Sequence, residues 1–171
     1  MTDHLRFPIG KYEAPAKPDA ETIAAWIEDI ARLPLQVRTA VQGASETQLD
    51  MPYRPGGWSV RQVVHHMADS HMNSFIRFKL ALTEEVPVIK PYREERWAEL
   101  PDTRQAPVAL SLALLDALHE RWVLLLRKLS DKELAGEFQH PDSGIIRLDQ
   151  NIGLYAWHGR HHLAHIRLIT G

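Results

Sequence analysis

The stretch from Trp157 to His165 places four of the ten histidines within eight residues, inside a segment with a helical pattern. At about 100° per residue, His158 and His162 stand about 40° apart on one helix face, and His165 falls between them. Imidazoles one turn apart can direct their Nε2 atoms at a single ion. A site with two donors on this helix needs at least one more from elsewhere. The pattern therefore predicts a metal centre that bridges two distant helices.

The segment from Val64 to His71 is the obvious source of the third donor. His65 and His66 are adjacent, so their side chains point about 100° apart and cannot serve one ion equally. The helix face of His66 is polar, and it also carries Asp69, Ser70, Asn73 and Arg77. The face of His65 is a packing face. We therefore expect His66 to be the ligand and His65 to be structural, with the reverse assignment open.

Two further residues are candidates for a catalytic role beside this triad. His165 could complete the coordination sphere, accept a proton or orient a bound water. Asp69 could accept the remaining N–H of a ligand histidine. On spacing alone, two histidines one turn apart more often belong to an ordinary packing face or solvated face of a helix than to a metal site. For the other histidines a structural role is the simpler interpretation, and these are His4, His71, His119 and His140.

The chain contains no cysteine, which excludes disulfides, thiolate catalysis and cysteine-ligated zinc or iron–sulfur sites. A metal must therefore rest on nitrogen and oxygen ligands, which suits zinc, nickel, iron, manganese or cobalt. The sequence also lacks a His-Glu-x-x-His motif, clustered paired carboxylates, a glycine-rich phosphate loop and a convincing Ser-His-Asp constellation. Three imidazoles on a divalent ion leave a position for water or a thiolate.

Length and charge limit the partners of the chain. At 171 residues it suits one domain, and a net charge of −2 gives no basic footprint for nucleic acid. No apolar run approaches the roughly 20 residues that span a bilayer, and the first twelve residues lack the apolar core of a signal peptide. We expect a cytoplasmic protein that acts on a small molecule and binds neither membranes nor nucleic acid.

The hydrophobic pattern predicts an all-α protein, a four-helix bundle with long connections. Residues 1–18 hold three prolines and are expected to form an extended arm, followed by a single domain over residues 19–171. The four long helices are expected from Asp19 with a break or bend at Pro34, from Ser59 to Leu82, from Pro107, and from a cap at Asp149 to Ile169.

Shorter elements are expected between the long helices. Ser59 with Gln62, and Ser130 with Glu133, fit the capping box that starts a helix. One short helix is expected within residues 93–100, and a brief extended piece over residues 145–148.

The chain resembles the DinB/YfiT-like superfamily of four-helix metalloproteins, most strongly over Trp58–Asn73 and Asn151–Ile166. Members usually show a helix-two histidine followed by an apolar residue, as in His66-Met67, and a later His-Gly-x-x-His pattern, as from His158 to His162. The resemblance thus implies the same ligand triad that the helix geometry favours.

The similarity is closer to the YfiT branch, through residues 69–79 and the Lys90-Pro-Tyr sequence. It implies a metal-dependent hydrolase with zinc or nickel, found in the cytoplasm as a homodimer. Related members are thiol S-transferases that use bacillithiol, and others are thiol-dependent isomerases. For such a cosubstrate, the side-chain chemistry of Asn73, Arg77 and Arg160 suits binding of the thiol's carboxylates.

Two classes of function follow. The first is a metalloenzyme that activates water for hydrolysis or a small thiol for S-transfer, with the transfer slightly favoured as the physiological reaction. The alternative is a non-catalytic protein in which the ion joins two helices through a closed site of four protein ligands, including His165. A plain bundle without metal is a third interpretation.

Overall fold

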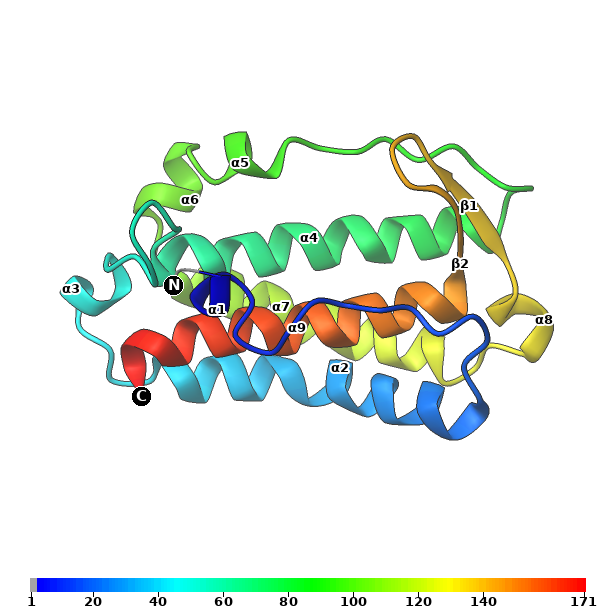
Figure 1. The fold of residues 1–171 in the computed structure, drawn as a ribbon, viewed down its shortest axis with the longest axis horizontal. Helices are drawn as coiled ribbons and strands as arrows, with labels where there is room; N and C mark the ends of the chain where they lie inside the picture. Colours follow the sequence, from blue (N-terminus) through cyan, green and yellow to red (C-terminus); the bar gives the residue numbers. More distant parts are fainter. Residues whose placement is uncertain (1–2) are drawn as a thin grey trace.

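The computed structural model describes residues 3–171, in which four long helices form the expected bundle (Figure 1). In order around the bundle, α2 contacts α9, α9 contacts α4, α4 contacts α7, and α7 contacts α2. The helix that carries the histidine cluster, α9, therefore lies beside the helix that carries His66. The four helices are α2 (Ala20–Val41), α4 (Val60–Ala81), α7 (Val108–Leu126) and α9 (Leu148–Thr170).

Short elements occupy the connections and lie mainly at the ends and along the upper side of the bundle (Figure 1). The two strands pair as an antiparallel hairpin, with Glu137 opposite Arg147. The second strand of this hairpin was predicted from the sequence, and the first was not. These elements are α1 (Asp3–Arg6), α3 (Glu46–Leu49), α5 (Glu94–Trp97), α6 (Pro101–Gln105), α8 (Asp131–Leu134), β1 (Glu137–His140) and β2 (Gly144–Arg147).

Both predicted capping boxes are confirmed. The Ser59 hydroxyl accepts the Gln62 N–H at 3.2 Å, and the Gln62 side chain accepts the Ser59 N–H at 2.9 Å. The same reciprocal pair joins Ser130 and Glu133 at the start of α8. Because each box satisfies otherwise unpaired N–H groups of a first turn, it defines where the helix begins. For α4 this sets the position of His66 along the bundle.

The predicted cap of the last helix at Asp149 is wrong. The helix α9 begins one residue earlier, at Leu148, with Arg147 as its N-cap residue. The backbone N–H of Leu148 donates to the carbonyl of Gly136, just before β1, at 2.9 Å, so the first N–H of the helix already has a partner. The Asp149 carboxylate instead pairs with the Arg147 guanidinium at 2.6 Å.

Pro34 does not end the first long helix, because α2 continues through it to Val41. Proline has no N–H, so the carbonyl of Ile30, four residues earlier, receives no hydrogen bond from its own helix. That carbonyl is buried with Ile30, which is 1 % exposed. It accepts a hydrogen bond from the Nδ1 of His119 on α7, at 2.7 Å.

The N-terminal arm crosses α9 (Figure 1). It is not wholly extended, because residues 3–6 form α1. The Tyr12 hydroxyl donates to the carbonyl of Gln150 at 3.1 Å, and the Trp157 indole donates to the carbonyl of Gly10 at 3.2 Å. The arm therefore covers one side of the histidine-bearing helix.

On its other side α9 approaches α2 so closely that only glycine fits at position 159. A Cβ atom there would lie 2.5 Å from the side chain of Leu33, which is itself buried. Since Gly159 follows His158 directly, this contact helps to set the height and rotation of the histidine face. No helix within residues 3–171 is long and apolar enough to cross a membrane.

Candidate metal centre

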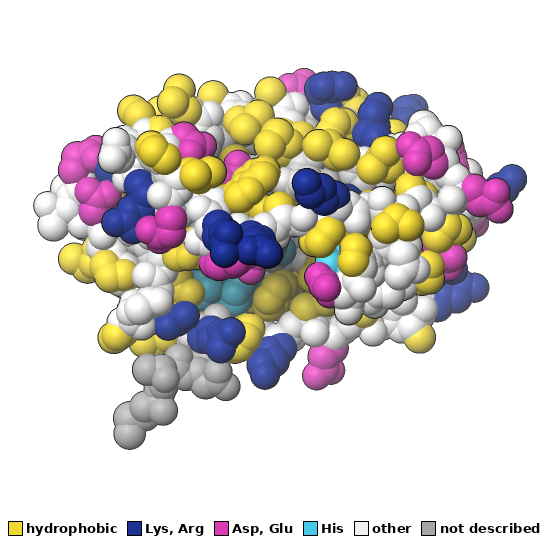
Figure 2. Space-filling view, turned by 90° about the horizontal axis from the view of Figure 1, so that it is seen from above, with side chains coloured by type: hydrophobic (Ala, Val, Ile, Leu, Met, Phe, Trp, Pro, Cys, Tyr) yellow, Lys and Arg dark blue, Asp and Glu magenta, His cyan; other side chains and the backbone are white. Residues whose placement is uncertain are grey.

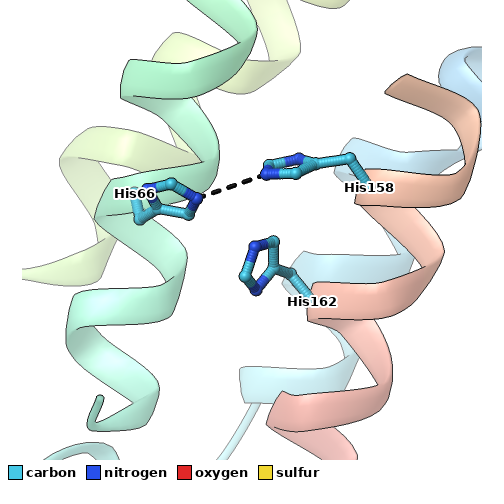
Figure 3. Close-up of side chains that lie close together, drawn as sticks. All are labelled: His66, His158 and His162. Atoms are coloured by element: carbon cyan, nitrogen blue, oxygen red, sulfur yellow. Dashed lines mark hydrogen bonds between the residues drawn. The ribbon is translucent and has the colours of Figure 1, made fainter. Parts of the chain in front are cut away.

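Three histidines from two helices converge at the centre of the site (Figure 3). One nitrogen from each of His66, His158 and His162 lies within 4.8 Å of the others. The Nε2 atoms of His66 and His158 are 3.2 Å apart. Two nitrogens bound tetrahedrally at zinc distances are separated by about 3.3 Å, so this spacing fits one ion.

Burial keeps the three imidazoles neutral. It lowers the pKa of His66 to about 4, with a smaller contribution from His161. It also lowers the pKa values of His158 and His162 well below the usual value, and neighbouring histidines add to the effect. A divalent ion requires the neutral form of each imidazole. The donor set therefore suits a metal without first losing protons.

The alternative ligand, His65, points away from this cluster. Its Nδ1 lies 2.7 Å from the Ser111 hydroxyl and its Nε2 lies 3.1 Å from the carbonyl of Ala106. Both ring nitrogens are thus engaged by α7 and the segment before it. Of the two adjacent histidines, the structure brings His66 to the cluster.

Little of the triad reaches the surface: His66 and His162 are 4 % and 7 % exposed, and His158 is partly exposed. Figure 2 shows histidine side chains at the floor of a hollow, with Lys and Arg side chains close to its rim. The indole of Trp58 lies against the cluster, with ring centroids 4.7 Å from His66 and 6.5 Å from His162. The Trp58 indole therefore limits the space beside the triad.

Comparisons with known proteins identify the family of the chain. The profile of the DinB superfamily matches residues 30–166. The chain belongs to the DinB superfamily. The YfiT protein of Bacillus subtilis, described as "a probable metal-dependent hydrolase with an unusual four-helix bundle topology", superimposes with a TM-score of 0.93 at 51% identity. That match covers 95% of this chain and 94% of YfiT.

Relatives in two other species are similar over nearly their whole length. A protein of Bacillus cereus is 57% identical over 162 residues, which are 95% of this chain and 93% of the relative. One of Bacillus mycoides is 56% identical over the same shares. Both bear the name "Putative metal-dependent hydrolase". These similarities confirm the resemblance to the DinB/YfiT-like superfamily.

His165 contacts His162 on one side and the N-terminal arm on the other. Its Nε2 donates to the carbonyl of Arg6 at 3.2 Å, which leaves the lone pair of the neutral ring on Nδ1. That Nδ1 lies 3.3 Å from the Nδ1 of His162 and accepts its proton in a hydrogen bond. The ring of Tyr53 stacks on His165 at 3.9 Å. His165 thus orients the His162 ring, a role that differs from the three considered for it.

A second group of three histidines shares His162 with the triad. It comprises His161, His162 and His165, again with one nitrogen of each within 4.8 Å of the others. His161 is packed between Trp157, stacked at 4.5 Å, and Phe7 of the arm at 5.8 Å. Since His165 already uses its Nδ1 to hold His162, we interpret this second group as support for the first.

Asp69 does not accept a hydrogen bond from a ligand histidine, contrary to expectation. Within the described part of the chain its carboxylate has no such partner, while its backbone carbonyl accepts the Asn73 amide at 2.9 Å. Its position three residues after His66 nevertheless keeps it on the adjoining part of α4. Burial, assisted by the charge of Asp102, raises its pKa to about 6. It is a carboxyl group that can exchange a proton near neutral pH.

The three residues expected to bind a cosubstrate are separated. Asn73 and Arg77 share the His66 face of α4 and are half-buried. Arg160 is exposed and pairs with Asp29 on α2. The prediction that Arg160 binds a cosubstrate at this site is therefore wrong. Arg160 lies two residues after His158 on the same helix, so its side chain is rotated by about 200° from that of His158.

Two histidines that the sequence analysis treated as structural lie directly behind His158. The Nε2 of His71 lies 3.0 Å from the Nδ1 of His158, and the Nδ1 of His71 lies 2.9 Å from the Nε2 of His119. Both side chains are buried, at 0 % and 2 % exposed. Their helices are not adjacent in sequence, so spacing could not show the contact. Pro34 was the one available signal, because it implies a carbonyl that needs a donor.

We predict that Asp69→Asn stabilises the metal-free protein in a pH-dependent way. A carboxyl pKa raised from 3.8 to about 6 means that the folded protein loses stability as pH rises between those values. Asparagine removes that loss. Discounted for partial exposure, the gain above pH 6 is about 1 kcal/mol, or roughly 2–4 °C in Tm.

Thermal unfolding at pH 4 and pH 8 measures this effect, with the wild-type protein as reference. The gain should be present at pH 8 and nearly absent at pH 4. An equal shift at both pH values, or none at pH 8, would contradict the raised pKa of Asp69.

Proposed function

We propose that the chain is a metal-dependent hydrolase that binds one divalent ion, zinc or nickel, through His66, His158 and His162. The observation that carries the proposal is the convergence of three neutral imidazole nitrogens within 4.8 Å, from two neighbouring helices. The names of the relatives within the DinB superfamily support the same reaction class. A purely structural ion is less well supported, because His165 faces His162 and leaves three ligands rather than four.

A divalent ion on three imidazoles acts as a Lewis acid that makes water or a thiol nucleophilic at neutral pH. In hydrolysis, the water oxygen forms a bond to the electrophilic centre of the substrate. One proton of that water goes to the Asp69 carboxylate, and the leaving group departs with the electrons of the broken bond and then takes up that proton. The raised pKa of Asp69 suits both transfers.

S-transfer from a low-molecular-weight thiol is a second candidate, favoured by Arg77. This guanidinium is half-buried, and no ion pair among residues 3–171 involves it. It lies eleven residues after His66, about 16 Å along the same face of α4. It could therefore bind a carboxylate at the far end of an extended thiol. In the transfer, sulfur bonds to the electrophilic carbon, the thiol proton goes to Asp69, and the leaving group departs with its electron pair.

His162→Ala tests the proposed site. We expect the metal content to fall from about one ion per chain to nearly none, and turnover of ester or amide substrates to be lost, because two ligands hold an ion poorly. His161→Ala is the matched control, since it removes the neighbouring histidine from the second group. Elemental analysis of untagged, folded proteins measures the effect. A metal-replete His162→Ala protein, or loss of metal in His161→Ala alone, would contradict the assignment.

The two candidate reactions are separated by a thiol titration of cobalt-substituted protein. If a small thiol with carboxylate groups is the cosubstrate, a sulfur-to-cobalt charge-transfer band should grow with saturation. Arg77→Gln should then raise the apparent Kd roughly tenfold, as expected for loss of one charge-assisted hydrogen bond. The same titration with a thiol lacking carboxylates is the control. Absence of the band with cobalt retained would leave hydrolysis as the sole proposal.

A further inference from the structure

The buried carbonyl of Ile30 is the starting point of a hydrogen-bonded chain that reaches the candidate metal centre. Pro34 gives it no N–H, so its donor is the Nδ1 of His119 at 2.7 Å. A carbonyl oxygen can only accept a hydrogen bond. The Nδ1 of His119 must therefore carry the proton of this contact.

The direction of every later contact follows from this one. Burial lowers the pKa of His119 to about 4, so its ring is neutral. His71 is fully buried between the imidazoles of His119 and His158, where a charged ring would be costly, so it is neutral as well. A neutral imidazole has one donor and one acceptor. The Nε2 of His119 thus accepts from the Nδ1 of His71 at 2.9 Å, and the Nε2 of His71 accepts from the Nδ1 of His158 at 3.0 Å. The Nε2 of His158 is left with a free lone pair on the side of His66.

We propose that His71 and His119 are positioning residues that hold His158 as its Nδ1–H tautomer, with Nε2 free for a metal ion. The proposal deepens the proposed function and rests on it. We call the chain from His158 through His71 and His119 to the Ile30 carbonyl the histidine relay. It passes through α9, α4, α7 and α2, so one hydrogen-bonded line joins all four long helices.

Aromatic side chains pack around the two buried histidines of the relay. The rings of His71 and His119 lie nearly parallel, with centroids 4.9 Å apart. Trp122 meets both rings edge-on at 5.9 Å, and Tyr155 meets His71 edge-on at 5.1 Å. At exposures of 0 % and 2 %, neither histidine has access to bulk water as an alternative partner. Reversing the protons would place a lone pair of His119 against the carbonyl oxygen, which buried polar groups avoid.

His162, the second proposed ligand on α9, is held as the same tautomer by an independent set of contacts. The Arg6 carbonyl accepts from His165, whose Nδ1 accepts from the Nδ1 of His162. His162 is thereby also an Nδ1–H tautomer. Two unrelated backbone carbonyls, one in α2 and one in the arm, thus set the same tautomer on both ligands of α9, a function that packing alone would not require.

Nitrogen-15 NMR of the histidine rings in metal-free wild-type protein tests the proton positions directly. The relay requires Nδ1–H for His158, His71 and His119. An Nε2–H tautomer at His158 or His71 would overturn the proposal. Because no metal is present, this result is independent of the proposed function. A protein with these three tautomers that binds no ion would contradict the function and leave the hydrogen-bond directions intact.

Variants of His119 test the effect on metal, since this residue contacts none of the three proposed ligands. His119→Phe keeps an aromatic ring and removes both hydrogen bonds, so zinc affinity should fall 10- to 100-fold. His119→Gln retains a donor and an acceptor and should bind zinc within about threefold of wild type. Leu112→Ala on α7 is the control for lost packing, and should lower Tm without changing zinc affinity.

Competition with a chromophoric chelator measures zinc affinity on protein shown to be folded by circular dichroism. Equal affinities for wild type and His119→Phe would overturn the positioning role, as would a loss in Leu112→Ala equal to that in His119→Phe. If His119→Phe does not fold, the tautomers of the wild-type protein decide the question.

Discussion

The buried carbonyl of Ile30 is an acceptor that its own helix cannot satisfy, because Pro34 has no N–H to donate. In a protein interior such a group must find a partner. His119 supplies it, and by doing so determines which nitrogen of each following histidine carries a proton. A backbone constraint in α2 thus reaches His158 on α9 through two buried rings. This one interaction therefore determines which ring nitrogen of His158 carries its proton and which presents a lone pair to the candidate metal centre.

The helix α9 is positioned for the same task by contacts on several sides. Gly159 allows α9 to approach Leu33 of α2 to van der Waals contact, and the N-terminal arm covers the opposite side of α9. His162 is held from the arm through His165. The α4 side is set by the capping box at Ser59, which begins the helix that presents His66. The ligands therefore sit on helices that are held from several sides, and Trp58 packs against two of the three rings.

Local signals predicted the parts of this structure that depend on local physics. Helical periodicity and the Ser59 capping box located α4, and the polarity of its faces distinguished His66 from His65. The spacing of His158 and His162 predicted their shared face. Each inference needed only the geometry of a single helix.

The wrong predictions concern features that are determined by contacts between distant parts of the chain. Asp149 is a plausible cap by sequence, but the carbonyl of Gly136, just before β1, already satisfies the first N–H of α9. Arg160 is paired with Asp29 of another helix. His71 and His119 form their contact across two helices, and no spacing within either segment encodes it. Pro34 was interpreted as a break or bend in a helix, when its larger consequence is the carbonyl of Ile30, four residues earlier, that it leaves without a donor.

The most direct test of this account is anomalous diffraction from crystals grown with zinc. The account predicts one strong peak per chain, bounded by the Nε2 atoms of His66, His158 and His162, with His71 and His165 hydrogen-bonded behind the two ligands of α9. A peak among His161, His162 and His165, or zinc bound only at the surface, would contradict it.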